Sequence, residues 1–155
     1  MRIHLIAVGT RMPRWVSDGF DEYARRLPAE CRLQLHEIPL GKRAANADIP
    51  RLMAREGERM VAAIPRGALT IALDRSGEQL STEALAERLQ GWLHSGNDVA
   101  LLVGGPEGLD PACLARSDRR LSLSPMTLPH PLVRIVIAEQ LYRAWSLLNN
   151  HPYHR

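Results

Sequence analysis

The residues of this chain that could take part in chemistry gather in two segments of its second half. Gly104-Gly105-Pro106-Glu107-Gly108 follows a continuous apolar run, and Asn149-Asn150-His151-Pro152-Tyr153-His154-Arg155 ends the chain. Glycines that follow a buried strand allow a close approach of the backbone to a ligand. Histidine, tyrosine and arginine can move protons or stabilise a developing anion. A frayed terminus is the simpler explanation of the tail, but this concentration of reactive side chains favours a function.

Other familiar signatures of ligand-binding sites are missing from the sequence. The first apolar run ends in Gly9-Thr10-Arg11-Met12-Pro13, which has one glycine where a dinucleotide-binding turn carries several. There is no Walker A loop and no G-x-S-x-G elbow. Cys31 and Cys113 form no C-x-x-C pair, and His151 and His154 have no evident third ligand, so we expect reduced thiols and no metal site.

Length and composition set the class of protein. The chain has 155 residues, of which 45% are hydrophobic and 24% charged, so we expect one globular domain spanning 1–155. No apolar run approaches the roughly 18 residues that a membrane span needs, and the N-terminus does not resemble a signal peptide. We therefore expect a cytoplasmic protein. A net charge of +3 permits nucleic-acid binding without requiring it.

Apolar runs alternate with amphipathic stretches along the whole chain. The expected strands are 3–8, 33–38, 69–74, 99–103 and 121–123, and the expected helices begin near Pro13, Asp48, Ser81 or Thr82, Pro111 and Pro129. Arg75-Ser76-Gly77 is expected to form the turn after the third strand. This alternation predicts an α/β fold, with a parallel sheet and helices on both faces.

The last helix carries more apolar surface than one packing face needs. Two neighbouring stripes cover about half of its circumference, against about 100° for a surface helix. The first contains Val133, Ile137, Leu141, Ala144 and Leu148, and the second contains Ile135, Ala138, Tyr142 and Trp145. One stripe can pack on the sheet, and a second copy of the chain is the simplest partner for the other. A helix buried within one chain is the alternative; we favour a homodimer through the C-terminal helix.

The order of the motifs is more specific than any one of them. Gly104–Gly108 is followed by Leu121-Ser122-Leu123-Ser124, by Met126-Thr127-Leu128-Pro129-His130-Pro131-Leu132-Val133-Arg134, by Glu139–Trp145 and by the tail. This series resembles the SPOUT methyltransferases and, within them, the ribosomal large subunit methyltransferase H family, the 23S rRNA pseudouridine N3-methyltransferases. The resemblance covers the whole chain and includes Gly41-Lys42-Arg43 near its start.

The resemblance implies a fold feature and a cofactor that periodicity cannot show. It implies a C-terminal trefoil knot, although knots are nearly absent from proteins, and knot loops that bind S-adenosyl-L-methionine. Loops at the C-terminal ends of parallel strands are also where physical reasoning places a ligand. The implied cofactor contacts are Leu73, Gly104, Gly105, Leu123, Ser124, Pro125, Met126, Thr127 and Leu128.

The resemblance also implies the type of catalytic help that the chain must give. A uracil-type imide nitrogen is a poor nucleophile until it loses its proton, so a nearby base or cation would help. The available candidates are His154, Tyr153, Arg155, Arg143 and His130. His130 lies between two prolines and can equally be structural, and Arg143 can pair with Glu139 one turn earlier. Which group removes the proton stays open.

The implied substrate is N3 of a pseudouridine in the helix 69 loop of 23S rRNA. The low net charge and the few free aromatic residues predict weak binding to naked RNA. We therefore expect action on the assembled ribosome, with docking at arginines near Lys42-Arg43 and at the tail. The resemblance further suggests that the tail of one subunit completes the pocket of the other. A non-catalytic ribosome-binding protein and a flavodoxin-like enzyme are the alternatives.

Overall fold

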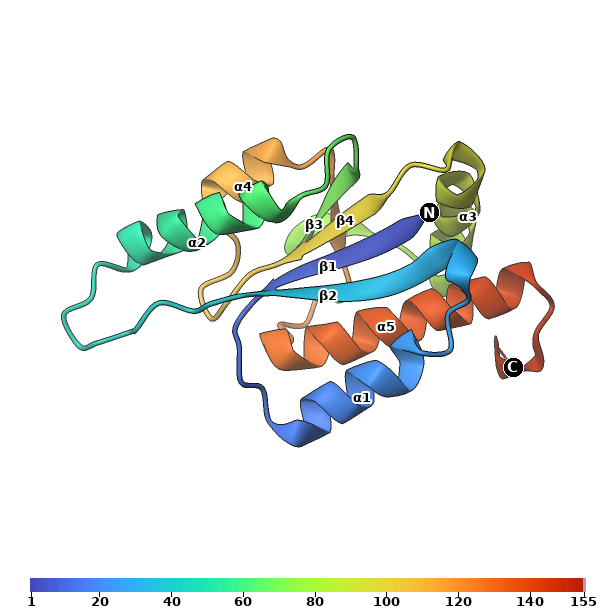
Figure 1. Ribbon diagram of the computed structural model, residues 1–155, viewed down its shortest axis with the longest axis horizontal. Helices are drawn as coiled ribbons and strands as arrows, with labels where there is room; N and C mark the ends of the chain where they lie inside the picture. The colour runs from blue at the N-terminus through green and yellow to red at the C-terminus, as the bar shows by residue number, and fades with distance from the viewer. Residues whose placement is uncertain (155) are drawn as a thin grey trace.

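The computed structural model describes residues 1–154, which form one parallel sheet with helices on both of its faces (Figure 1). The five strands lie in the order β2-β1-β4-β3-β5 and all neighbours are parallel, as the alternation of apolar runs predicts. The strands are β1 (Arg2–Val8), β2 (Arg32–Ile38), β3 (Leu69–Gln79), β4 (Val99–Val103) and β5 (Arg119–Ser122). Every residue of the central strand β4 is buried, which explains its uninterrupted apolar sequence.

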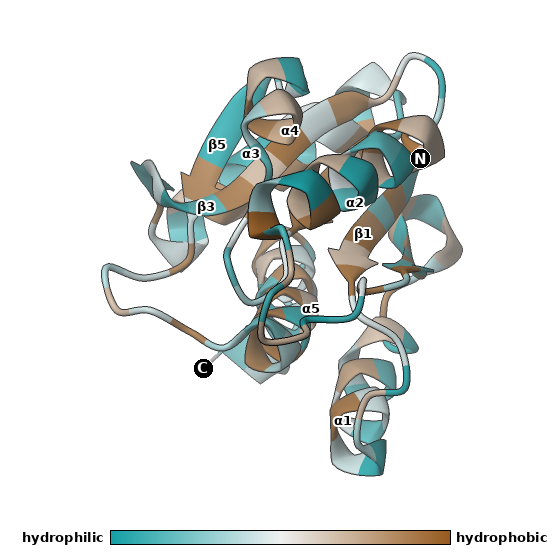
Figure 2. Cartoon of the chain, turned by 90° about the vertical axis from the view of Figure 1, so that its left-hand side faces the viewer, coloured by the Kyte–Doolittle hydropathy of each residue, from teal (hydrophilic) through white to brown (hydrophobic). Residues whose placement is uncertain are grey.

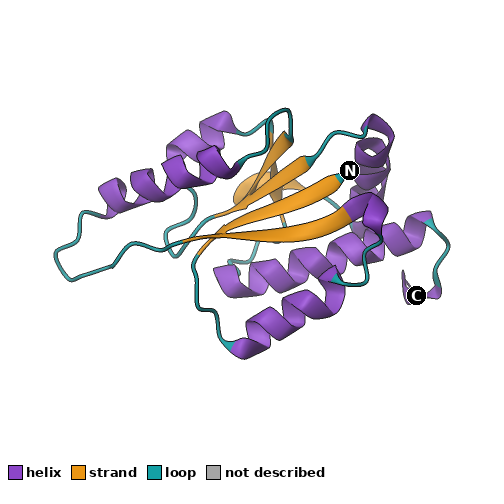
Figure 3. Ribbon diagram, viewed as in Figure 1, coloured by secondary structure: helices purple, strands orange, loops and turns teal. Residues whose placement is uncertain are grey.

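The helices divide between the two faces of the sheet (Figure 3). On one face lie α1 (Arg14–Ala24), α3 (Thr82–Ser95) and α5 (His130–Leu148), and on the other lie α2 (Ile49–Ala63) and α4 (Pro111–Arg116). Alternation along β1 sends Ile3 and Leu5 to the first face and Ile6 and Val8 to the second. Two short 3-10 turns, η1 (Ala29–Cys31) and η2 (Pro152–His154), complete the described elements.

Side-chain caps fix where three of the helices begin. The carboxylate of Asp48 accepts from the backbone N–H of Arg51, and Asp110 accepts from Ala112 in the same way. Of the two caps that the sequence offers for α3, Ser81 is the one used, because its hydroxyl accepts from the backbone N–H of Ala84. These caps set the N-terminal ends of α2, α3 and α4, and so the positions of the loops before them.

The turn expected at Arg75-Ser76-Gly77 is wrong. β3 continues through these residues to Gln79, and its pairing with β5 is interrupted only between Leu73 and Glu78. Gly77 makes the continuation possible, since a Cβ there would lie 2.6 Å from the carbonyl carbon of Arg120. A glycine that looked like a turn residue instead allows two backbones to approach closely.

Part of the second apolar stripe of α5 is covered within the chain, which weakens that argument for a dimer, although Ile135 and Trp145 remain half-buried. Ala138 and Tyr142 are buried within the chain. Ile135 packs so closely on α1 that a Cβ on Gly19 would lie 2.9 Å from its Cδ1, and the indole N–H of Trp145 donates to Glu30. α5 lies between α1 and α3, which together cover what a simple surface helix would leave exposed. The homodimer itself stays a prediction.

Candidate active site

A cavity of about 320 Å³ opens at the edge of the sheet where the strands end. Three segments far apart in the sequence line it: the irregular part of β3, the glycine-rich loop after β4, and the loop that leads from β5 into α5. Its lining residues are Leu73, Asp74, Arg75, Pro106, Glu107, Gly108, Ser122, Leu123, Ser124, Met126, Thr127, Leu128 and Val133. This is the edge at which open parallel sheets bind their ligands.

Most of the cofactor contacts implied by the sequence lie around this cavity. Leu73, Leu123, Ser124, Met126, Thr127 and Leu128 line it, whereas Gly104, Gly105 and Pro125 do not. The residues that sequence reasoning missed are the immediate neighbours of those it named, such as Asp74, Glu107 and Val133. These residues lie within or directly beside the sequence motifs that named the others. Asp74 directly follows Leu73 at the expected end of the third strand, and the sequence analysis did not name it.

The glycine-rich loop folds tightly back on itself. The backbone N–H of Gly108 donates to the carbonyl of Gly105 at 3.0 Å, and Gly108 has a φ of +85°. A Cβ on Gly104 would overlap the backbone of Gly108. A Cβ on Gly105 would instead lie 3.2 Å from Val8 and 3.4 Å from Leu40. Gly105 therefore forms the back of the loop, and its neighbours Pro106 to Gly108 form the cavity wall.

The loop from 122 to 128 is held in shape by its own polar groups. The hydroxyl of Ser122 donates to the carbonyl of Ser124 at 3.0 Å, and the Ser124 hydroxyl accepts from the backbone N–H of Met126 at 2.9 Å. The guanidinium of Arg75 donates to the hydroxyl of Thr127 at 2.7 Å, which ties this loop to β3 across the cavity. The side chain of Met126 is 76% exposed at the rim.

Arg43 anchors the opposite wall. Its guanidinium donates to Glu56 at 2.5 and 2.9 Å and to Glu107 at 2.7 Å. The hydrogen bond from Arg43 lowers the pKa of Glu107. Burial acts to raise the pKa of Glu56, but hydrogen bonds from Arg43 and the Gly41 amide outweigh it and hold that pKa below its ordinary value. The expectation that Arg43 docks RNA is not supported by these contacts, because two carboxylates occupy its guanidinium.

Arg134 is a buried anchor that the sequence analysis quoted but did not single out. It is 1% exposed and donates to the carbonyl of Gly9 at 2.8 Å and to Glu37 at 2.7 Å. These bonds fasten the start of α5 to the ends of β1 and β2. The sequence signal for this anchoring role was an arginine that lies between apolar neighbours in a helix expected to be buried.

His130 lies beside this anchor and outside the cavity lining. Its Nδ1 is buried without a hydrogen-bond partner among the described residues, and its Cε1 would lie 3.5 Å from a Cβ on Gly9. Burial, and secondly the charge of Arg134, lower the pKa of His130, so its ring is neutral at pH 7. This placement supports the structural interpretation of His130 over the catalytic one.

The C-terminal tail is ordered against its own α5. The hydroxyl of Tyr153 donates to Glu139 at 3.1 Å, and its ring lies 4.6 Å from that of Tyr142. Arg143 pairs with Glu139 at 2.7 Å, as the alternative interpretation proposed, and lies 5.0 Å from the Tyr153 ring. Burial and the bond to Glu139 raise the pKa of Tyr153 to about 12. A frayed terminus is therefore not what residues 149–154 form.

None of the described tail candidates reaches the cavity of its own chain. Arg143, Tyr153 and His154 are absent from the cavity lining, and Figure 1 shows the C-terminus at the end of α5 away from the loops that line the cavity. His154 has a buried Nδ1 without a partner among the described residues. Arg155 lies outside the described residues.

Two other features, a cluster of metal ligands and a membrane-spanning helix, are absent from residues 1–154. No three His, Cys, Asp or Glu side chains lie together as metal ligands would. None of the described helices combines the length and the apolar character that crossing a bilayer requires.

A parallel sheet with a cavity of loops after β3, β4 and β5 fits many α/β enzymes, and sequence comparison shows which class this chain belongs to. The family model described as "Predicted SPOUT methyltransferase" matches residues 1–154, and this chain belongs to that family. Family membership implies the C-terminal trefoil knot.

Three relatives carry the name "Ribosomal RNA large subunit methyltransferase H". The protein of Thioalkalivibrio sulfidiphilus is 63% identical over 155 residues, which cover 100% of this chain and 99% of that protein. Those of Methylococcus capsulatus and Marinomonas sp. are 59% and 55% identical, each over 100% of both chains.

Two solved structures share the fold at low sequence identity. A probable methylase family protein from Haemophilus influenzae has a TM-score of 0.53 at 16% identity, over 99% of this chain and 70% of that chain. A probable methyltransferase from Bordetella pertussis has a TM-score of 0.57 at 16% identity, over 92% of this chain and 95% of that chain. They support the fold and carry no argument about substrate.

Proposed function

We propose that this chain transfers a methyl group from S-adenosyl-L-methionine to N3 of a pseudouridine in the helix 69 loop of 23S rRNA, on the assembled ribosome in the cytoplasm. One observation carries the proposal: residues from β3 and from the loop after β5, which the family resemblance implies as cofactor contacts, converge on one cavity. The relatives named as large-subunit ribosomal RNA methyltransferases support the substrate class.

The cavity has the shape and chemistry that this cofactor needs. Its volume of about 320 Å³ falls within the range of roughly 300–1,000 Å³ typical of small-molecule sites. Leu73, Leu123 and Leu128 supply apolar walls for an adenine ring. Asp74 brings a carboxylate to the same cavity, which suits a ligand with a positive sulfonium and ammonium, whereas the Glu107 carboxylate is already held by Arg43. The residues present therefore fit the cofactor.

When bound, the cofactor supplies a methyl group already activated by its positive sulfur. The residues of the chain have to orient the acceptor nitrogen behind that methyl and exclude water. The apolar walls of Leu73, Leu123 and Leu128, together with Met126 at the rim, suit the exclusion of water. The acceptor must also lose a proton, and none of the described tail candidates lines the cavity of its own chain.

We therefore retain the homodimer, now argued from the tail. The end of α5 and the tail of one subunit supply their groups to the pocket of the other. Arg143 can stabilise the acceptor anion as a permanent cation. Tyr153 carries a phenol, which is protonated at neutral pH, and so can donate a hydrogen bond. His154 is the described tail residue best suited to accept the proton.

Methyl transfer from labelled cofactor tests the proposal directly. Assembled ribosomes, isolated large subunits and a short naked hairpin are offered in parallel, and calorimetry measures cofactor binding. We expect transfer to assembled ribosomes, little to the hairpin, and none where uridine replaces the pseudouridine. Binding to ribosomes without transfer would favour the non-catalytic alternative, and flavin absorbance of the purified protein would favour the flavodoxin-like one.

A further inference from the structure

A second hollow lies on the α2 side of the molecule, apart from the cofactor cavity. Its volume is about 340 Å³, and it is formed where the loop after β2 meets the first turns of α2. The residues that line it are Lys42, Ala44, Ala47, Asp48, Arg51, Leu52 and Arg55. Three cations thus converge on a hollow that contains one carboxylate.

These three cations are not neutralised by the described residues. Lys42, Arg51 and Arg55 are all exposed, and none of them takes part in an ion pair within residues 1–154. Asp48 is engaged as the cap of α2, since it accepts from the Arg51 backbone N–H at 3.2 Å. Arg51 and Arg55 lie one turn apart on α2, a like-charge spacing that weakens a helix. A bound polyanion would relieve that repulsion.

The loop that carries Lys42 is held in place from below. The backbone N–H of Gly41 donates to Glu56 at 2.7 Å, and Arg43 donates to the same carboxylate and to the carbonyl of Gly41. Lys42 therefore lies between Gly41 and Arg43, both of which are hydrogen-bonded to Glu56 of α2. Figure 1 shows the loop projecting from the body of the molecule, and Figure 2 shows this end of α2 facing outward. A preorganised cation loses less conformational entropy on binding.

The hollow and the cofactor cavity share one connection. Arg43 lies beneath the loop and bonds Glu107 at 2.7 Å, and Glu107 lines the cofactor cavity. Arg43 follows Lys42 directly in the chain, so this bond links the loop of the hollow to the wall of the cofactor cavity. Phosphate groups suit the hollow because Lys and Arg side chains neutralise them with the release of counterions.

We propose that Lys42, Arg51 and Arg55 bind backbone phosphates of the ribosomal RNA and so place the acceptor base at the cofactor cavity. This inference rests on the proposed function, and it assigns RNA docking to α2 and the loop before it. Arg43, whose guanidinium is paired with Glu56 and Glu107, supports this surface from within and makes no RNA contact.

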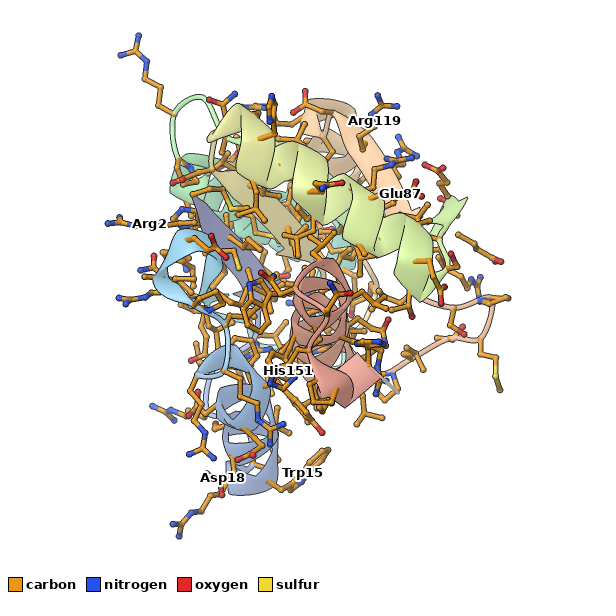
Figure 4. All side chains as sticks on the ribbon, turned by 90° about the vertical axis from the view of Figure 1, so that its right-hand side faces the viewer. Arg2, Trp15, Asp18, Glu87, Arg119 and His151 are labelled. Atoms are coloured by element: carbon orange, nitrogen blue, oxygen red, sulfur yellow. The ribbon has the colours of Figure 1, made fainter. Side chains whose placement is uncertain are left out.

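The test compares two triple variants with the same loss of charge. K42Q/R51Q/R55Q removes the cations of the hollow, and R116Q/R119Q/R120Q removes three exposed arginines around β5, where Arg119 points outward (Figure 4). We expect the first triple to raise KM for ribosomes about tenfold or more and to lower the salt-dependence slope by roughly 0.7–0.9 for each lost phosphate contact. The effect should fall on KM more than on kcat, with cofactor affinity by calorimetry and the melting temperature preserved.

Three results would overturn the proposal: an unchanged KM, an equal rise in KM for both triples, or a parallel loss of cofactor affinity. Equilibrium binding to ribosomes, measured by co-sedimentation, is run on the same proteins. It tests the hollow even if the unmodified protein transfers no methyl group. In that case the proposed function fails, and weaker sedimentation of the first triple alone would still support the hollow.

Discussion

The two ends of α5 are built for different tasks. At its start, Val133 lines the cavity and Arg134 fastens the helix to the ends of β1 and β2. At its far end, Tyr142, Arg143 and the folded-back Tyr153 form a cluster of aromatic and charged groups. A helix of 19 residues is about 28 Å long. Within one chain the proposed cofactor pocket and the proposed proton-handling groups therefore do not meet, and a second chain is the simplest way to unite them.

The largest loss of methyl transfer is expected from removing the tail, because it carries proposed proton-handling groups. Deletion of 153–155 should lower methyl transfer to ribosomes by about 100-fold or more, the range for loss of general acid–base and electrostatic help. Cofactor affinity should be unchanged, because the tail contacts α5 and not the cavity lining. Full activity without the tail would remove it from the reaction.

Subunit mixing tests whether the two ends meet between chains. A tail-deleted protein is mixed with a Leu128→Arg variant, whose new side chain should block the cavity. At equal amounts and random exchange, about a quarter of the activity of the unmodified protein should return, because half the dimers are mixed and each of these has one complete site out of two. Mixing two samples of the same variant is the control. Light scattering that gave a monomer mass for the unmodified protein would exclude the dimer.

Substitutions at the adjacent Gly104 and Gly105 test which glycine keeps the loop closed beside the cavity. Gly104→Ala should weaken cofactor binding about tenfold or more, because its Cβ would overlap the Gly108 backbone and force the loop open. Gly105→Ala should have a smaller effect, since its Cβ meets only the side chains of Val8 and Leu40. Calorimetry of both variants measures the difference. Equal affinities would mean that the closed form of this loop does not matter for binding.

The smallest expected effect is on stability against pH. Burial lowers the pKa values of His36 and His130 from 6.5. Protonation then favours the unfolded chain, so stability is full above pH 6.5 and falls as the pH drops below it. The lowered pKa values of Glu56 and Glu107 act only below about pH 4.5.

Urea unfolding at pH 7.5 and 5.5 measures this loss, which we expect to be on the order of 1 kcal/mol or less after solvent screening. His130→Gln should reduce the loss, whereas the same change at the exposed His94 should not. A larger free energy of unfolding at pH 5.5 would contradict the direction.

The sequence predicts what depends on local pattern. Apolar runs locate the strands, Ser81 caps α3 as expected, and motif order names most of the cavity residues in the loop after β5. These features follow from side-chain chemistry within a few residues, which a single sequence displays. Leu73, which the family resemblance implies as a cofactor contact, lines the cavity at the end of its strand, and its contact with a cofactor stays a prediction.

What the sequence does not predict depends on partners far along the chain. Gly77 looked like a turn residue because the strand β5 that it approaches lies more than forty residues later, at Arg120. Arg43 looked like a free RNA-binding cation because its partners, Glu56 and Glu107, are 13 and 64 positions away. Periodicity shows that α5 has two apolar stripes, but it cannot show that α1 and α3 cover them.

The bond between Tyr153 and Glu139 makes the tail an internal competitor of the reaction proposed for it. A segment tethered to its own helix binds there at an effective concentration of roughly millimolar. Only the fraction of tails that has left this resting place can serve a neighbouring pocket, and apparent affinity falls in proportion to that fraction. The Tyr153 hydroxyl, held at 3.1 Å from Glu139, would thus set how often the enzyme is ready to act.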